Sequence, residues 1–396
     1  MTSICMYFQV HQPMRLRHFS VFGEHAERLD ERYFDCDLNR RILEKVANKC
    51  YLPTNELLLR LIEDNHGSFK ISYSLSGSFL EQAKRFCPQL IESFQRLAKT
   101  GCVEFLDETY YHSLASLFTD KREFAEQVRL HADALKELFG ARASTFRNTE
   151  VIFSNDIARL AEGMGYSAIM TEGLESLLGW RSPNYVYSVA GTDGMRALLR
   201  NFKLSDDVSY RFSARWWSEW PLTADKYARW LAASEGQCIN LFMDYETFGE
   251  HQWSETGIFS FLEHFPREAL KYQHLEFQTP AEVVRDNEPV GEVSAENPVS
   301  WADIERDTSA WLGNDMQREC FHFLQDIGTR VRSRGDDEML HSWRLLQNSD
   351  HLYYLCTKSL ADGDVHKYFS PFESPYDGFI NYMNILQDFS QKADEA

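Results

Sequence analysis

Two acidic residues that directly follow strand-like apolar runs could carry out catalytic chemistry. Glu150 closes the run ASTFRNTE at 143–150, and Asp244 closes QCINLFMD at 237–244. In α/β barrels the catalytic groups lie at the carboxyl ends of the strands. Hydrolysis of a glycosidic bond needs two carboxyl groups, one to protonate the leaving oxygen and one to act as nucleophile or base. Because the chain has 60 Asp and Glu residues, either one alone could be an ordinary loop acid.

A second group of polar residues follows the first strand-like run, SICMYFQV at 3–10. Pro13 ends that run, so His11 and Gln12 should lie at its carboxyl end. At the mouth of a barrel, their donors and acceptors could bind sugar hydroxyls. A turn that carries a surface histidine is the alternative.

Acidic residues also occur within the segment VEFLDETYYH at 103–112. Glu104 and Glu108 would point partly into a barrel, where buried acids need partners. His112 follows them closely. We interpret these residues as groups that bind the substrate or support the catalytic residues, and we predict that His112 contacts the substrate.

The segment MDYETFGEHQ crowds Asp244, Glu246, Glu250 and His251 together. We predict that Glu246 and His251 bind the substrate. A metal site is the competing interpretation of this region.

Three histidines, His11, His112 and His251, together with nearby carboxylates, could form a three-ligand metal site with an open position. A metal-dependent sugar deacetylase would use such a site. However, no HxH or HxxxH pair occurs in this region. We therefore expect no metal and no cofactor.

Tryptophans form a further set of candidate substrate contacts. Trp216, Trp217 and Trp220 cluster in RWWSEWP, and Trp301 and Trp311 lie further along the chain. Aromatic faces pack well against the apolar faces of sugar rings, although most aromatic residues fill cores. We predict that some of these five residues contact the substrate.

Composition limits the partners. The 396 residues carry 41 basic and 60 acidic side chains, a net charge of −19, which argues against nucleic acid or an anionic membrane as partner. The N-terminal MTSICMYFQVHQP lacks a basic region, and no apolar stretch is long enough to span a membrane, so we expect a cytoplasmic protein. The 8 cysteines include no CxxC pair, which argues against a disulfide framework or zinc ribbon. A homo-oligomer is one option for its assembly.

Seven strand-like runs alternate with helical patterns along the first 290 residues. The runs are 3–10, 69–76, 102–109, 144–150, 166–172, 195–202 and 238–244. The helical segments are 39–64 with a break at Pro53, 81–101, 120–140 with Asp120 as N-cap, 154–165 and 223–236. This alternation predicts a parallel sheet covered on its faces, here an irregular, incomplete (β/α)7 barrel, with an open doubly wound sheet as alternative.

The pattern changes near 286–300, where Pro and Gly interrupt a stretch without periodicity, which indicates a connection. Helical segments follow near 306–333, 337–361 and 374–393, punctuated by GDD at 335–337, ADGD at 361–364 and SPFESP at 370–375. We therefore predict a catalytic barrel at 1–290. A C-terminal helical bundle at 291–396 should contribute to the active-site cleft.

Taken together, these motifs resemble those of glycoside hydrolase family 57, particularly its α-amylase-type members. The matching segments, in order along the chain, are His11-Gln12-Pro13, 101–112, 146–156, 241–251 and 300–314. They span residues 4 to about 314. One difference is that Asn148-Thr149 precede Glu150, where many members have Pro or Ala.

The resemblance implies a (β/α)7 barrel with a helical region and no cofactor. It implies that Glu150 is the nucleophile and Asp244 the acid/base of a retaining enzyme, with carboxyl groups roughly 5–5.5 Å apart. It also implies an α-1,4-glucan or maltooligosaccharide substrate and hydrolysis of the α-amylase type. A 4-α-glucanotransferase or branching enzyme would use the same pair, and a non-catalytic glucan-binding protein or the deacetylase is a more distant alternative.

Overall fold

Seven parallel strands form a closed ring in the computed structural model, which describes residues 1–358 and 370–395. The strands are β1 (Thr2–Val10), β2 (Ile71–Leu75), β3 (Val103–Phe105), β4 (Thr145–Phe146), β5 (Ala168–Glu172), β7 (Arg196–Arg200) and β8 (Cys238–Asp244). They pair in that order, and β8 returns to β1. Two of the strand pairings are short. A single bridge from Asp107 to Phe146 joins β3 to β4, and a single residue pair, Arg200 with Asn240, joins β7 to β8. The predicted irregular seven-stranded barrel is confirmed.

The first strand is a fully buried member of this ring. All of β1 is buried, and it pairs with β8 from Ser3–Cys238 to Gln9–Asp244. A strand covered on both faces needs apolar residues without strict alternation, as SICMYFQV has. The pairing places the carboxyl end of β1, and with it the following His11, beside Asp244.

Three short strands extend the ring beyond the prediction. Strand β6 (Tyr187–Val189) pairs antiparallel with β7, β10 (Glu292–Val293) pairs with β6, and β9 (Leu275–Phe277) pairs with β1. The stretch 286–300 is therefore more than a connection. It contributes β10, and Val299 forms a bridge with Phe153.

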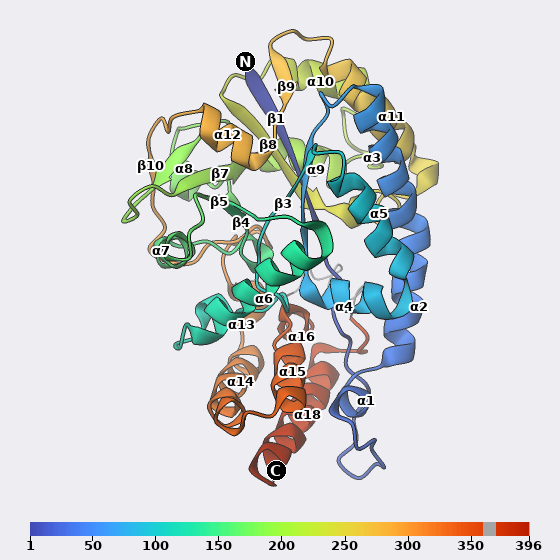
Figure 1. The fold of residues 1–396 in the computed structure, drawn as a ribbon, viewed down its shortest axis with the longest axis vertical. Coiled ribbons are helices and arrows are strands. Elements are labelled where there is room, and N and C mark those ends of the chain that lie inside the picture. Colours follow the sequence, from blue (N-terminus) through green and yellow to red (C-terminus); the bar gives the residue numbers. More distant parts are fainter. Residues whose placement is uncertain (359–369, 396) are drawn as a thin grey trace.

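Helices cover the outside of the ring (Figure 1). They are α2 (Cys36–Val46), α3 (Leu52–Asp64), α4 (Gly77–Phe86), α5 (Pro88–Ala98), α6 (Arg122–Phe139), α7 (Asn155–Gly163), α8 (Glu175–Leu178), α9 (Phe202–Ser209), α10 (Ala224–Ala232), α11 (Ile258–Ala269) and α12 (Pro280–Asp286). The short helix α1 (Leu29–Tyr33) lies beside the C-terminal helices instead. The single helix predicted at 81–101 is wrong. Pro88 lacks a backbone N–H and begins α5 instead, which divides the segment in two.

Two other predicted helix ends can be compared directly. Gly140 ends α6 with φ of 65°, as expected for a glycine stop. The N-cap of α6 is Lys121, although the carboxylate of Asp120 accepts the backbone N–H of Arg122. The predicted break at Pro53 is wrong, because the chain stays helical from α2 through a π-helical turn at Ala47–Tyr51 into α3, and Pro53 lies in the first turn of α3.

The C-terminal part is helical, as predicted, and Figure 1 shows it at the end of the molecule toward which β1 runs. Its helices are α13 (Ser309–Leu312), α14 (Asp315–Arg334), α15 (Asp337–Leu346), α16 (Ser349–Tyr353) and α18 (Pro375–Glu395). The predicted turn at 361–364 lies outside the described residues. The single helix predicted at 337–361 is wrong, because α15 ends at Leu346 and a separate helix, α16, ends at Tyr353.

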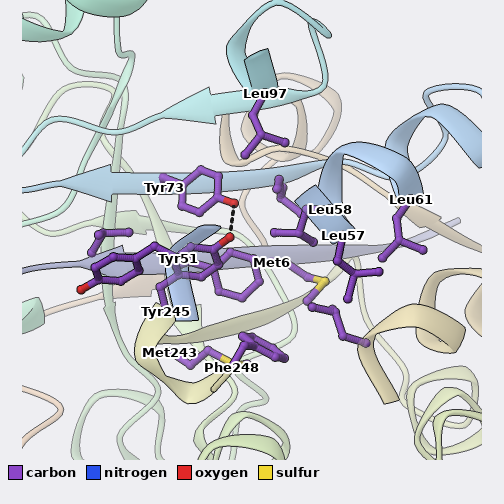
Figure 2. Close-up of a cluster of buried hydrophobic side chains, with 14 of the residues drawn as sticks. Met6, Tyr51, Leu57, Leu58, Leu61, Tyr73, Leu97, Met243, Tyr245 and Phe248 are labelled. Carbon is purple, nitrogen blue, oxygen red and sulfur yellow. Dashed lines mark hydrogen bonds between the residues drawn. The ribbon is translucent and has the colours of Figure 1, made fainter. Parts of the chain in front are cut away.

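Buried side chains on both sides of the ring hold these layers together. Figure 2 shows part of one cluster, in which Tyr51, Tyr73 and Tyr245 pack with Phe248 and the hydroxyl of Tyr73 donates to that of Tyr245 at 3.2 Å. A second cluster joins barrel residues such as Phe146 to helices of the C-terminal part. None of the helices built from the described residues has the length and apolarity needed to cross a bilayer.

Candidate active site

A cavity of about 470 Å³ opens where the carboxyl ends of the strands meet the C-terminal helices. Glu150 and Asp244 both line it. The other residues of interest in its wall are Gln9, His11, Gln12, Arg15, Lys45, Arg200, Tyr210, Glu246, Glu250, His251, Trp301, Trp311, Asp350, Tyr353 and Tyr354. Segments from both the barrel and the helical part therefore build one site.

Glu150 is held from several directions. Its backbone has φ of 56°, a left-handed conformation that residues other than glycine adopt at a cost in free energy. The ring nitrogen Nε2 of His112 lies 3.0 Å from its Oε1, and the indole Nε1 of Trp301 donates to its Oε2 at 2.8 Å. Both carboxylate oxygens thus have a nitrogen partner.

His112 links Glu150 to a buried acid behind it. Its Nδ1 lies 2.9 Å from Oε2 of Glu108, which also accepts from Nη1 of Arg147 at 3.3 Å. Burial opposes a charged imidazole, but hydrogen bonds with Glu108 and Glu150 outweigh it and raise the pKa of His112 to about 9. Burial likewise opposes the charged Glu108, yet His112 and Arg147 bring its pKa down to about 2.

The same neighbours act on Glu150. Burial alone would raise its pKa, but His112, Arg147 and Trp301 together lower the pKa of Glu150 below its ordinary value. This carboxyl group is therefore ionised at neutral pH, as a nucleophile must be.

Asp244 has the opposite environment. Burial, together with the negative charge of Glu150, raises the pKa of Asp244 to about 6, against the opposing charges of Arg147 and Arg200. An acid with this pKa can carry a proton near neutral pH and release it again.

Glu246 lies in the same wall as Asp244. Burial and the charge of Asp244 raise the pKa of Glu246 to about 8. The hydroxyl of Tyr51 and Nε2 of Gln12 both contact its Oε1, the latter at 3.4 Å. Gln12 is fixed in turn by Arg15, whose Nη2 donates to the amide oxygen at 3.1 Å.

His11 connects the barrel to the helical part. Its Nδ1 lies 2.7 Å from Oγ of Ser76 and its Nε2 lies 3.0 Å from Oδ2 of Asp350, while its ring stacks on that of His112 at 3.9 Å. Burial and the charge of His112 lower the pKa of His11. Although burial opposes the charged form of Asp350, the His11 contact brings the pKa of Asp350 to about 2.

Comparison with known proteins identifies the family. The family model described as "Glycosyl hydrolase family 57" matches residues 5–296. The chain belongs to glycosyl hydrolase family 57. A curated relative from Methanocaldococcus jannaschii, named "Putative alpha-amylase", is 50% identical, and the match covers 98% of this chain and 84% of the relative.

Solved structures share the fold of this family 57 enzyme. The branching enzyme of Pyrococcus horikoshii has a TM-score of 0.71 at 12% identity, covering 99% of this chain and 95% of that one. The 4-alpha-glucanotransferase of Thermococcus litoralis has a TM-score of 0.64 at 17% identity, covering 89% of this chain. This chain spans 56% of the length of that longer protein. The family membership makes the chain a glycoside hydrolase.

The tryptophans predicted to contact the substrate of this family 57 enzyme separate into two groups. Trp301 and Trp311 line the cavity. Trp216 and Trp220 are 82% and 43% exposed and do not belong to its lining. Trp217 also lies outside the lining and packs against Trp230 instead.

The histidines considered as metal ligands are placed differently from one another. Both ring nitrogens of His11 and of His112 already contact Ser76 or carboxylates within the site. His251 lines the cavity, and burial lowers its pKa to about 4. Among residues 1–358 and 370–395, no group of three His, Cys, Asp or Glu residues is arranged to hold a metal ion.

Several residues of the site in this family 57 enzyme were not predicted from the sequence. Asp350 lies in QNSDHLYYL at the start of α16, where no strand precedes it. Lys45 comes from α2 and Tyr51 from the π-helical turn that follows it, and the carboxylate of Glu250 binds Lys45. Only the polar QNSD segment, an N-cap pattern within an otherwise apolar helical region, could have drawn attention to Asp350.

Proposed function

We propose that this enzyme hydrolyses α-1,4-glucans with retention of configuration, using Glu150 as nucleophile and Asp244 as general acid/base. The observation that carries the proposal is the contrast between the two carboxyl groups of one cavity. Glu150 has a lowered pKa, and Asp244 has a pKa raised to about 6. Two carboxyl groups with pKa values driven apart are the equipment of a double displacement.

The reaction follows from these protonation states. The carboxylate of Glu150 attacks the anomeric carbon, while Asp244 gives its proton to the glycosidic oxygen that leaves. Asp244, now ionised, takes a proton from water, and that water displaces Glu150 from the covalent glycosyl-enzyme. Two inversions at the same carbon give retention, and this geometry needs the carboxyl groups roughly 5–5.5 Å apart.

Other residues of the cavity wall suit a neutral, hydroxyl-rich substrate. His11, Gln12, Glu246 and His251 offer donors and acceptors for sugar hydroxyls. Tyr353, which is partly exposed, supplies aromatic surface. His112 is fully buried and reaches the chemistry through Glu150.

Within this proposal the chain divides near residue 290. The barrel at 1–290 carries both catalytic carboxyl groups. The helical region at 291–396 completes the cleft, because Trp301, Trp311 and Asp350 line the same cavity.

Product analysis on maltooligosaccharides tests the proposal. The wild type, with and without chelator, should release shorter products and new reducing ends, whereas Glu150→Gln should not. Glu296→Gln makes the same chemical change at an exposed position and should behave like the wild type. Paired shorter and longer products would instead indicate a glucanotransferase, in which a sugar hydroxyl replaces water. Full turnover by Glu150→Gln would contradict the nucleophile assignment.

A further inference from the structure

A segment at 299–307 crosses directly over Glu150. Val299 and Phe153 exchange backbone hydrogen bonds at 2.8 and 2.9 Å, which ties the segment to the chain just after Glu150. Oγ of Ser300 donates to the backbone oxygen of Glu150 at 2.9 Å, and Nε1 of Trp301 donates to its Oε2 at 2.8 Å. Consecutive residues of one segment thus hold both the backbone and the side chain of Glu150.

The indole ring of Trp301 is itself held by cations. The guanidinium carbons of Arg147 and Arg200 lie 5.4 and 5.7 Å from its centroid, and these arginines are 0% and 3% exposed. Cations in a dry environment attract an aromatic ring strongly. They also draw electron density from the indole, which makes its N–H a better donor toward a carboxylate.

The rest of the segment is anchored at its far side. Nη1 of Arg306 donates to the backbone oxygen of Trp301 and lies 3.3 Å from Oε2 of Glu172. Nζ of Lys358 contacts Asp303 at 3.0 Å and Glu305 at 2.9 Å. Asp303 and Arg306 have φ of 58° and 54°, left-handed conformations that persist only where the surroundings hold them.

We propose that Trp301 is a positioning residue, whose indole N–H fixes and polarises the carboxylate of Glu150, and not a stacking surface for sugar. Its N–H complements the His112 contact on the other oxygen, so the carboxylate cannot rotate without losing a donor. The inference rests on the proposed role of Glu150 as nucleophile.

Replacing Trp301 by Phe separates the two roles, because Phe keeps an aromatic ring and loses the N–H. Loss of a hydrogen bond to a charged group should lower kcat on maltooligosaccharides about 10- to 100-fold with little change in KM. Without that donor the pKa of Glu150 rises, so the acidic limb of the kcat/KM profile should move to higher pH. A stacking role predicts instead nearly full kcat and an unmoved acidic limb.

Trp343→Phe is the matched control. The indole Nε1 of Trp343 donates to the backbone oxygen of Leu324 at 2.9 Å, and the side chain is buried away from the cavity. The same chemical change should therefore lower Tm but leave the acidic limb in place. If Trp343→Phe moved the limb as far as Trp301→Phe, the effect would be structural and the proposal would fail.

A readout independent of turnover keeps this test apart from that of the proposed function. In ¹H–¹⁵N spectra, the indole resonance missing from Trp301→Phe belongs to Trp301. Replacing the carboxylate by an amide in Glu150→Gln should move that resonance upfield and leave the Trp343 resonance in place, whether or not the wild type cleaves glucans. A Trp301 resonance that does not respond to Glu150→Gln would overturn the proposal.

Discussion

The two carboxyl groups of the cavity, Glu150 and Asp244, have opposite environments. Around Glu150, His112, Arg147 and Trp301 supply N–H donors and positive charge, and the carboxyl group stays ionised. Around Asp244, burial and the charge of Glu150 dominate, and the proton is retained to a pKa of about 6. The difference teaches that nearby groups, more than the choice of Glu or Asp, set the protonation states on which the proposed roles rest.

Replacing Asp244, the proposed proton donor, should have the largest effect. Asp244→Asn cannot protonate the leaving oxygen, so kcat on maltooligosaccharides should fall on the order of 10²- to 10⁴-fold. Aryl glycosides, whose leaving groups need little protonation, should lose much less. Steady-state kinetics on both substrates measure this, with the exposed Asp193→Asn as control. Equal losses on both substrates would exclude a general-acid role.

Removing the cation beside Glu150 should make the environments of Glu150 and Asp244 more alike. In His112→Asn the pKa of Glu150 rises, so the acidic limb of kcat/KM moves to higher pH. The pKa of Asp244, which His112 also lowers, rises as well, so the basic limb moves the same way. We expect a loss of about 10- to 100-fold in kcat/KM. The surface variant His264→Asn should change neither limb.

The same variant should reveal the contribution of His112 to stability. Its folded pKa of about 9 lies above the unfolded value of about 6.5, so the stabilisation is fully present below pH 6.5 and is lost as the pH rises through about 9. The Tm difference between wild type and His112→Asn should therefore shrink between these pH values. A constant Tm difference would show that the imidazole is not charged in the folded protein.

A smaller effect is expected from replacing Glu246, which lies in the same part of the cavity wall as Asp244. With a pKa of about 8, Glu246 is largely uncharged where Asp244 titrates, and Gln resembles its protonated form. Glu246→Gln should therefore leave the basic limb near pH 6, while lost contacts lower kcat/KM about 10-fold. A basic limb displaced to lower pH would mean that Glu246 is ionised there and raises the pKa of Asp244.

The smallest effect is expected from a residue that lies outside the cavity. Trp216 is 82% exposed and does not line the cavity. Trp216→Ala should change kcat and KM on short maltooligosaccharides by no more than about twofold. A larger rise in KM would restore this residue to the substrate contacts that its sequence context suggested.

The barrel could be predicted because each of its strands leaves a local pattern. The buried run 3–10 and the run ending at Asp244 are recognisable without their partners, and the carboxyl ends of parallel strands must share an edge. The site was harder to predict because its other members come from distant segments. Asp350 lies in a helix, and no local pattern connects it with His11. Three clustered tryptophans at 216–220 likewise say nothing about which way they face.

The bond between His11 and Asp350 joins residues 339 positions apart, and it constrains the order of events during synthesis. At about 5–20 residues per second, the ribosome needs roughly 17–70 s to make the chain between them. When the ribosome has made the segments that carry Glu150 and Asp244, the last quarter of the chain, which supplies the rest of the cavity wall, has not yet been made. During that interval His11 lacks its carboxylate partner, and slow translation of the last part of the message would accumulate chains that hold Glu150 and Asp244 but lack a complete cleft.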